Sequence, residues 1–366
     1  MIKKKRIFVA VTNDISTDQR VHKTSSYLIE KGFDVLVYGR VLPTTFQVKR
    51  PYKIQRKKML FNNNFLFYAE YNFRLFFKLL FYKCDYILAN DLDTLLACFF
   101  ASKFKKATLV YDSHELFSEG PELQGRKFVA SFWRSLENYL LPKIKKSYTV
   151  SQSIADFYNT KYNTKMGVVK NVPLLDREIK KIEVKLPTKN KTVLYQGVLN
   201  PGRGIKPMIK ALHLLENVDL IIIGYGKVEE ELQSFVKEEL LENKVHFLGR
   251  IPHGELPNYT KLATLGMVLE EPLGLSFEYS LPNKLFDYIH AELPLISGNL
   301  TEIKKIVDVN NVGVSIENYS PKTIANAIEK LLSDKKLYDE IKMNQRKTKK
   351  MFSWEREKLL LDNYFI

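Results

Sequence analysis

The sequence is short of cysteine and of long apolar stretches. Its 366 residues include two cysteines, Cys84 and Cys98, which are too few for a disulfide framework. We expect both thiols to be small buried side chains in a reducing cytoplasm. The most apolar stretch, residues 60–82, is interrupted by charged side chains and is therefore a poor membrane span. These shortages predict a cytoplasmic protein, either soluble or attached peripherally to the inner face of the membrane.

Acidic residues are also scarce relative to basic ones. The chain has 57 lysines and arginines against 41 aspartates and glutamates, which gives a formal net charge of +16. A field of this sign attracts nucleic acids, acidic lipids and phosphorylated substrates alike. The charge therefore indicates an anionic partner without naming its class.

Short β-branched or aromatic runs alternate with amphipathic stretches along the chain, which is the pattern of βαβ units. The expected strands of the first half are 6–11, 34–38, 85–89, 108–111, 148–150 and 167–170. Those of the second half are 192–196, 219–223, 244–248, 266–269, 294–296 and 312–314. The sequence thus predicts an α/β fold of two Rossmann-like, doubly wound domains that face each other across a cleft, with ligands at the carboxyl ends of the strands.

The two halves are separated by a charged, aperiodic stretch that contains Pro187 and has no apolar face. We predict a first domain over 1–178, a linker over 179–190 and a second domain over 191–345. Residues 346–366 form a C-terminal helical segment, for which packing back on the first domain is one alternative.

A glycine-rich loop follows the expected strand 192–196. It contains Gly197, Gly202 and Gly204 and leads into a helix, so its backbone N–H groups could approach a phosphate. Arg203 adds a bidentate cation at this point. The loop matches neither the P-loop nor the dinucleotide fingerprint. A tight turn with a surface arginine would explain it equally well.

The stretch 281–289 reads Leu-Pro-Asn-Lys-Leu-Phe-Asp-Tyr-Ile. Pro282 suits the first turn of a helix, where free N–H groups and Lys284 would form a second anion site. Asp287 lies one turn beyond Asn283 on the same helix face and could accept hydrogen bonds from two vicinal hydroxyls, as on a ribose. The alternative is an amphipathic helix with solvated charges.

With these motifs, the chain resembles the family-four glycosyltransferases of bacterial cell-surface polysaccharide pathways, which have the GT-B fold. The resemblance covers nearly the whole chain, and its most specific segment is 280–288. The other matching segments are 12–14, 18–21, 111–116, 171–173, 196–198 and 247–249. The resemblance implies retaining transfer of a sugar from a nucleotide-diphosphate sugar to a saccharide or lipid-linked acceptor.

The resemblance also implies roles for single residues. Arg203 and Lys284 would hold the donor diphosphate and assist catalysis, and His114 would lie near the sugar and the acceptor. The expected donor-binding residues, all in the second domain, are Gly197, Asn200, Gly202, Gly224, Gly226, Asn283, Leu285 and Asp287. The expected acceptor-side residues in the first domain are Asn13, Asp14, Asp112 and Glu115. No cofactor and no metal are expected. Because Arg203, Lys284 and Asp287 are assigned to the donor, we expect their removal to leave stability unchanged.

Two features depart from this family pattern. The first glutamate of its E-x7-E motif falls on Tyr279, with Glu278, Glu270 and Glu271 nearby, and Asp287 replaces the second glutamate. In addition, residues 91–93 read Asp-Leu-Asp, the D-x-D metal signature of the other glycosyltransferase fold. A helix N-cap explains this aspartate pair without a metal.

A basic cluster over residues 49–58 precedes an aromatic segment over residues 61–82. A basic run beside an amphipathic stretch is typical of attachment to an anionic membrane surface. The alternative is that the aromatic side chains pack within the first domain and the basic run is a solvated loop.

Two rival functions remain. A GT-B nucleotide-sugar epimerase would release a free sugar without an acceptor. A non-catalytic nucleic-acid-binding protein would use the positive charge, but a carboxylate at position 287 is unfavourable beside phosphates. We therefore expect no specific nucleic acid as partner.

Overall fold

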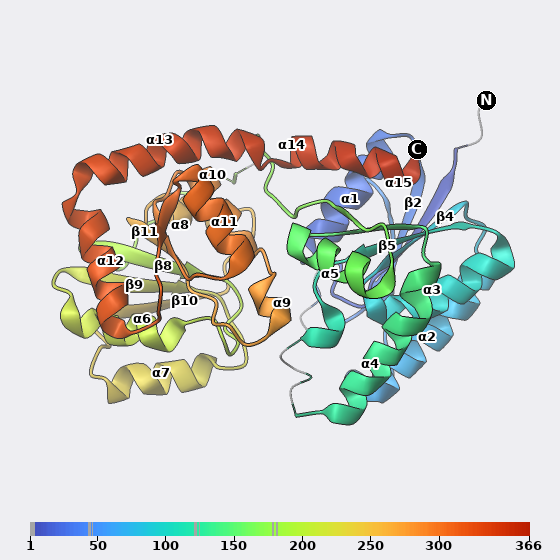
Figure 1. Cartoon of the computed structure of the whole chain (residues 1–366), viewed down its shortest axis with the longest axis horizontal. Coiled ribbons are helices and arrows are strands. Elements are labelled where there is room, and N and C mark those ends of the chain that lie inside the picture. Colours follow the sequence, from blue (N-terminus) through green and yellow to red (C-terminus); the bar gives the residue numbers. More distant parts are fainter. Residues whose placement is uncertain are drawn as a thin grey trace. The chain divides into compact units, whose positions relative to one another are not determined.

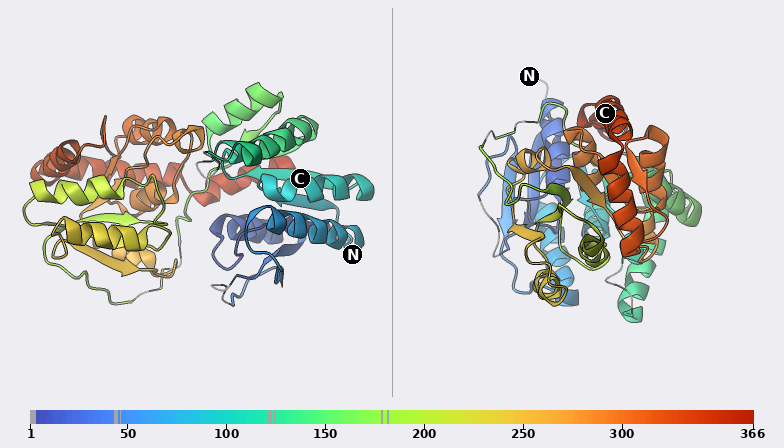
Figure 2. Two further views of the ribbon diagram at one scale, coloured as in Figure 1. Left: turned by 90° about the horizontal axis from the view of Figure 1, so that it is seen from below. Right: turned by 90° about the vertical axis from the view of Figure 1, so that its left-hand side faces the viewer.

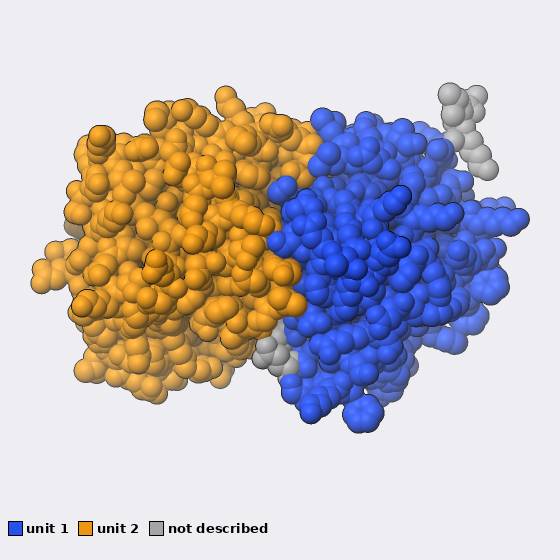
Figure 3. Space-filling model, in the orientation of Figure 1, with its two compact units in different colours: residues 1–170, 358–366 blue, residues 171–357 orange. Residues whose placement is uncertain are grey.

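The computed structural model describes residues 4–42, 45, 47–120, 123, 125–177, 179–180 and 182–366. The chain divides into two compact units, which Figure 3 shows in different colours. Unit 1 comprises Met1–Lys170 and Lys358–Ile366, and unit 2 comprises Asn171–Glu357. The division therefore precedes the predicted boundary at 178, and the described part of the expected linker 179–190 belongs to unit 2.

Unit 1 is built on a seven-stranded parallel sheet in the order β3-β2-β1-β4-β5-β6-β7. Its strands are β1 (Arg6–Ala10), β2 (Asp34–Arg40), β3 (Lys53–Lys57), β4 (Tyr86–Asn90), β5 (Thr108–Ser113), β6 (Lys146–Thr149) and β7 (Gly167–Val168). The chain order reverses between β1 and β4, so polar side chains after these strands meet at one switch point.

One strand of unit 1 was not predicted from the sequence. β3 lies in the basic cluster, which the sequence analysis assigned to a loop or a membrane contact. As an edge strand it is only partly buried, and lysine is a usual residue at such an edge. Part of the basic cluster is therefore structured by pairing with β2.

The helices of unit 1 cover both faces of its sheet. They are α1 (Gln19–Glu30), α2 (Asn64–Phe81), α3 (Leu92–Lys105), α4 (Lys127–Leu140) and α5 (Gln152–Tyr162). Right-handed crossovers place α2, α3 and α4 on the face opposite α1, where they lie side by side (Figures 1 and 2). The C-terminal helix α15 (Asp362–Phe365) packs on the α1 face, because Asp362 accepts hydrogen bonds from Tyr27 and Lys31.

The packing interpretation of the aromatic segment holds for one face of α2. Phe67, Tyr71 and Leu75, spaced four residues apart, are buried against the sheet. Phe65 and Phe73 lie on the other side and are exposed. None of the helices in the described part of the chain has the length and hydrophobicity that a membrane span requires.

Unit 2 contains a six-stranded parallel sheet in the order β10-β9-β8-β11-β12-β13. Its strands are β8 (Lys191–Gln196), β9 (Val218–Ile223), β10 (Val245–Gly249), β11 (Leu265–Val268), β12 (Leu295–Ser297) and β13 (Gly313–Ser315). Every strand predicted for this half is present. The predicted α/β architecture of two doubly wound domains is thus confirmed.

The helices of unit 2 bury a hydrophobic core on each face of this sheet. They are α6 (Ile205–Ala211), α7 (Glu229–Glu238), α8 (Leu256–Thr260), α9 (Leu275–Glu278), α10 (Asn283–Ala291), α11 (Thr301–Asn310), α12 (Pro321–Ser333), α13 (Lys335–Met351) and α14 (Trp354–Glu357). Val193 and Tyr195 of β8 point into one core, and Leu194 between them points into the other. Helix α13 is continuous through position 345, where the second domain was predicted to end.

Candidate active site

The two cations predicted to hold the donor converge on a buried glutamate. Glu270 follows β11 at the carboxyl edge of the second sheet and is fully buried. Its Oε1 lies 2.7 Å from Lys284 Nζ and 3.5 Å from Arg203 Nη1. Both cations were predicted from the sequence, but the role of Glu270 in holding them together was not.

The two cations differ in how they are held. Lys284, in the first turn of α10, is 6% exposed, and its Nζ lies 4.1 Å from the centroid of the Tyr195 ring. Arg203 is 28% exposed, and its guanidinium lies over the Phe277 ring. Removal of Lys284 would leave Glu270 buried without its nearest cation, which is strongly destabilising. The buried ion pair therefore predicts a role for Lys284 in stability, contrary to the expectation from the sequence.

The predicted glycines allow the loops after β8 and β9 to meet. A Cβ atom at Gly224 would overlap the carbonyl oxygen of Gly197, and one at Gly226 would overlap that of Leu199. The Leu199 N–H donates to the Tyr225 carbonyl at 2.9 Å. These glycines thus have a packing role, whether or not they line a nucleotide pocket.

The loop between β8 and α6 is also tied to β11. Gly202 accepts a hydrogen bond from the Glu271 N–H at 2.9 Å, which brings Arg203 next to Glu270. Asn200 donates its backbone N–H to the Val198 carbonyl and is partly exposed. The loop is therefore shaped by its own backbone before any ligand binds.

Helix α10 places its predicted donor-binding residues in different surroundings. Asp287 Oδ2 accepts a hydrogen bond from Gln196 at 3.1 Å, and its Oδ1 forms an ion pair with Arg177 at 3.4 Å. Asn283 accepts a hydrogen bond from Asn171 at 2.9 Å. The Leu285 side chain, predicted to lie at the donor, is instead fully buried in the core, because it falls on the apolar face of the helix.

A small cavity lies beside Asp287. It has a volume of about 170 Å³ and is lined in part by Gln196, Arg177 and Thr260. Among the other carboxylates near the E-x7-E position, Glu278 accepts hydrogen bonds from the backbone N–H and the hydroxyl of Thr301. Glu278 therefore caps α11, and Glu270 is the carboxylate that meets the predicted diphosphate cations.

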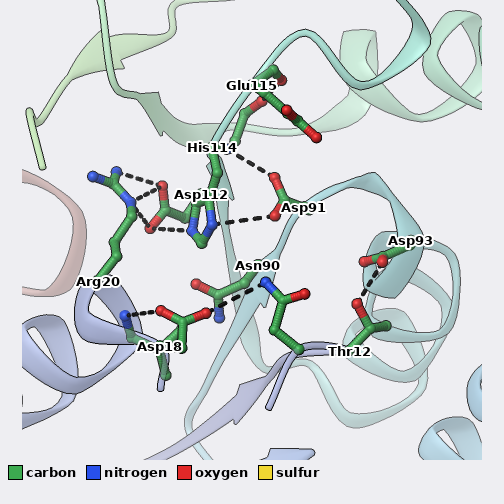
Figure 4. A network of polar contacts seen from close by, with 12 residues as sticks. Thr12, Asp18, Arg20, Asn90, Asp91, Asp93, Asp112, His114 and Glu115 are labelled. Atoms are coloured by element: carbon green, nitrogen blue, oxygen red, sulfur yellow. Dashed lines mark hydrogen bonds and ion pairs between the residues drawn. The ribbon is translucent and has the colours of Figure 1, made fainter. Parts of the chain in front are cut away.

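A second polar cluster lies at the carboxyl edge of the first sheet (Figure 4). Asp112, at the end of β5, is fully buried and binds Arg20 of α1 through both oxygens, at 2.6 Å for the shortest contact. His114 Nδ1 lies 3.2 Å from Asp91, and its Nε2 lies 3.3 Å from Asp112. Asp91 also accepts the backbone N–H of His114 at 2.8 Å.

This cluster fixes the charge of His114. Burial lowers the pKa of His114, but the nearby carboxylates of Asp91 and Asp112 outweigh it and raise the pKa to about 9. Burial also raises the pKa of Asp112, yet Arg20 and His114 bring it below its usual value. At neutral pH His114 is therefore an imidazolium, which can donate hydrogen bonds but cannot act as a general base.

The predicted acceptor-side residues differ in burial and in their contacts. Asp112 was expected to face the acceptor, but it is fully buried and positions Arg20 and His114 instead. Asp14 is buried in a turn before α1, where it accepts hydrogen bonds from Ser16. Asn13 contacts Asp18, the N-cap of α1. Glu115 follows on the loop with an exposed side chain, outside the cluster (Figure 4).

The two aspartates of the D-x-D motif have separate partners. Asp91 is the N-cap residue of α3, but its side chain makes no capping hydrogen bond and binds His114 instead. Asp93 accepts a hydrogen bond from Thr12 at 2.5 Å. Figure 4 shows the two carboxylates directed to different sides of the helix start. The interpretation of Asp91 as a side-chain N-cap is therefore wrong.

The roles of three residues of these clusters were not predicted from the sequence, namely those of Arg20, of Asp91 as the partner of His114, and of Glu270 as the partner of the two cations. Glu270 directly follows the predicted strand 266–269, and Asp91 lies shortly after the predicted strand 85–89. A systematic reading of the charged residues at the carboxyl ends of all strands would have found them. Arg20 carries no such signal, because its role depends on the position of α1 beside β5.

Comparison with known proteins agrees with this architecture. A model described as Glycosyltransferase Family 4 matches residues 18–172, and one described as Glycosyl transferases group 1 matches residues 176–348. Sucrose-phosphate synthase from Thermosynechococcus elongatus superposes with a TM-score of 0.83 at 16% identity, covering 99% of this chain and 98% of that one. HepE from Anabaena in complex with UDP-glucose has a TM-score of 0.74 at 15% identity and 98% coverage of both chains.

A curated relative extends the comparison in sequence. An alpha-D-kanosaminyltransferase from Streptomyces kanamyceticus is 22% identical over 158 residues. The match covers 42% of this chain and 39% of the relative. The fold and the two matching family models define the class of GT-B glycosyltransferases. Within that class, the chain belongs to the group 1 and family 4 glycosyltransferases, whose two models together match most of its length.

Proposed function

We propose that this protein transfers a sugar, with retention at the anomeric carbon, from a nucleotide-diphosphate sugar to an acceptor. The convergence of Arg203 and Lys284 at the carboxyl edge of the second sheet carries this proposal. Two cations around one buried carboxylate leave a net positive site, which favours a diphosphate. Arg203, the more exposed cation, would leave Glu270 and bind the diphosphate in a bidentate manner.

The donor is proposed to be a UDP-sugar, because the similar HepE structure contains UDP-glucose. Asp287 would accept hydrogen bonds from the ribose hydroxyls in place of those from Gln196 and Arg177. The cavity beside Asp287 gives these hydroxyls access to the carboxylate. The proposed acceptor is a saccharide or a lipid-linked molecule of cell-surface polysaccharide synthesis, made at the inner face of the membrane.

The proposed reaction uses no metal. The bond between the sugar and the diphosphate breaks while the acceptor oxygen bonds to the same face of the anomeric carbon. The leaving diphosphate oxygen accepts the acceptor proton, and Arg203 and Lys284 stabilise its growing charge. His114 is an imidazolium at neutral pH whose two N–H groups face Asp91 and Asp112, so its proposed role is to contribute positive charge near the bound sugar or acceptor.

Steady-state kinetics with UDP-sugars and extracted lipid-linked acceptors test this proposal. Arg203→Ala is expected to lower kcat by roughly 10²–10³-fold, because a preorganised charge partner of the transition state is lost. Asp287→Ala is expected to raise the donor KM with a smaller effect on kcat. Lys206→Ala is the matched control, since Lys206 lies on α6 but pairs with the exposed Glu231. Normal turnover of Arg203→Ala would place the diphosphate elsewhere.

Two further arms of the same experiment separate the rival functions. A free sugar formed from the donor at full rate without an acceptor would indicate an epimerase instead. Activity in excess EDTA is expected to equal that in buffer. Activity that disappears with EDTA and returns with Mn²⁺ or Mg²⁺ would overturn the metal-independent mechanism.

A further inference from the structure

A large apolar groove lies in unit 1, on the face of the sheet opposite α1. Helices α2, α3 and α4 enclose it, and its volume is about 1060 Å³. Aromatic side chains from all three helices line it, among them Phe73, Phe76, Phe104, Phe132 and Trp133. Its volume is at the upper end of those of pockets that hold small organic ligands. The groove is thus large enough for a long, slender apolar ligand.

The aromatic side chains around the groove are unusually accessible. Phe104 is 72% exposed and Phe128 is 93% exposed, and both belong to its lining. Proteins rarely leave contiguous apolar surface of this kind in contact with water unless another molecule covers it. Trp133, deeper in the same groove, is buried. The surface is therefore hollowed rather than flat, and it has an inner wall that a ligand could contact.

One part of the lining is polar. Asp93, at the start of α3, is 6% exposed, and its Oδ1 has no hydrogen-bond partner among the described groups. Its Oδ2 accepts a hydrogen bond from Thr12. Asn72 lies next to Asp93 and uses its side chain to bind the backbone of α3. A buried, unpartnered carboxyl oxygen in a ligand groove is a place for a donor group of the ligand.

The polar part of the groove adjoins the candidate acceptor site. Asp93 is two residues from Asp91, whose carboxylate holds His114 at the end of the sheet (Figure 4). From Asp93 the wall continues along α3 to Phe104, eleven residues further, which is about 16 Å at the rise of an α-helix. A ligand that fills the groove would therefore have a polar head at Asp93, at the start of α3, and an apolar tail along the helix.

We propose that this groove binds the hydrocarbon chain of a lipid-linked acceptor and that Asp93 binds a hydroxyl of its head. This inference rests on the proposed glycosyl transfer. It specifies that the acceptor is lipid-linked and that its chain binds to unit 1. A bilayer surface would cover the protruding rings of Phe104 and Phe128, but it would not fill the hollow down to Trp133. A single chain fills the hollow and presents its head at the polar end.

The test is direct binding without donor or turnover. Trp133 reports on the groove by its fluorescence, and the second tryptophan, Trp354, lies in unit 2. A brominated single-chain alcohol, kept below its micelle concentration, is expected to quench Trp133 saturably. Bromoethanol, which has the hydroxyl and the bromine without the chain, is expected to cause no saturable quenching. Straight-chain and isoprenyl alcohols form separate arms that show which chain is preferred.

Ala69→Phe provides the blocking variant. Ala69 is exposed on α2 and lines the groove, so a phenylalanine there fills the space without disturbing the core. We expect the affinity for the brominated alcohol to fall about tenfold or more. Phe81→Ala is the control, because Phe81 is exposed on the same helix but outside the lining. Its affinity should equal that of the wild type.

Three results would overturn the proposal. The first is quenching that Ala69→Phe leaves unchanged, and the second is quenching by brominated vesicles but by no monomeric chain. The third is a dimer in light scattering that Ala69→Phe converts to a monomer, which would mean that a second copy of the chain covers the groove. Failure of the proposed function is distinguishable, because it would leave chain binding intact while no sugar is transferred. Transfer with no chain binding would remove this inference alone.

Discussion

His114 is the residue whose ionisation the structure determines most clearly. Burial alone would lower its pKa, but Asp91 and Asp112 raise the pKa to about 9. A raised histidine pKa contributes stability that is fully present below about pH 6.5 and is lost as the pH rises through 9. We expect the His114 ring signal in NMR to titrate near pH 9.

The matching stability measurement uses His114→Gln. Between pH 6.5 and 9 the unfolding free energy of the wild type should fall relative to that of the variant, by an amount on the order of 3 kcal/mol. Outside this window the difference should stay constant. A His114 signal that titrates at or below pH 6.5 would show that the two carboxylates do not hold the imidazolium.

Lys284 is expected to combine a structural role with its proposed catalytic one. Because Glu270 is fully buried, Lys284→Ala should destabilise the protein by about 3–5 kcal/mol. The measurement is chemical denaturation without any ligand. Arg203→Ala should cost much less, since Arg203 is more exposed and lies further from Glu270.

The double variant Lys284→Met with Glu270→Gln is the internal check. It removes both charges and keeps side chains of similar size, so much of the lost stability should return. If Lys284→Ala alone is as stable as the wild type, Glu270 must find another partner, and the assigned role of Lys284 in the fold is wrong. Kinetic effects of Lys284 variants are interpretable only after this measurement.

At the scale of elements, the sequence predicts strands well where hydrophobic periodicity is strong. The strands β8, β9, β11 and β12 of unit 2 follow this pattern, because the inner strands of a parallel sheet are buried on both faces. The strand β3 was not predicted, because an edge strand needs no apolar run and most of its residues are basic. Arg203 and Lys284 were predicted because each lies where a loop opens a helix. Their convergence on Glu270 was not predicted, because it depends on the pairing of β11 with β8 in the sheet.

The contact between the loops after β8 and β9 gives an element-scale prediction. A Cβ atom at position 226 would overlap the backbone of Leu199. That backbone cannot move away without breaking the hydrogen bond from the Leu199 N–H to the Tyr225 carbonyl. Gly226→Ala should therefore destabilise unit 2 by about 1–3 kcal/mol. It should also weaken donor binding, because Arg203 lies on the displaced loop.

Gly254→Ala is the matched control in thermal and chemical denaturation. No atom lies within 4 Å of a Cβ there, and its φ is not in the left-handed region. The substitution should change stability by less than about 1 kcal/mol, in the stabilising direction. Equal effects of the two alanines would show that the loops are not in tight contact.

At the scale of the whole molecule, the chain combines a large positive net charge with an exposed apolar surface. The net charge is +16, and the lining of the groove includes exposed phenylalanines and Arg126. Anionic lipid attracts the charge, and the interfacial region accepts the rings. These two contributions respond differently to salt, because only the electrostatic one is screened.

We therefore expect the protein to cosediment with anionic vesicles at low salt and to be released in part as salt increases. Phe104→Ser with Phe128→Ser should weaken this binding, because two exposed rings are no longer available for insertion, each contributing up to about 1.5–3 kcal/mol. Val309→Ser is the control, since Val309 is an exposed apolar residue of α11 in unit 2. If both variants bind completely at low salt, and neither they nor the wild type bind at high salt, charge alone attaches the protein. No binding of the wild type to anionic vesicles at low salt would remove the proposed peripheral location.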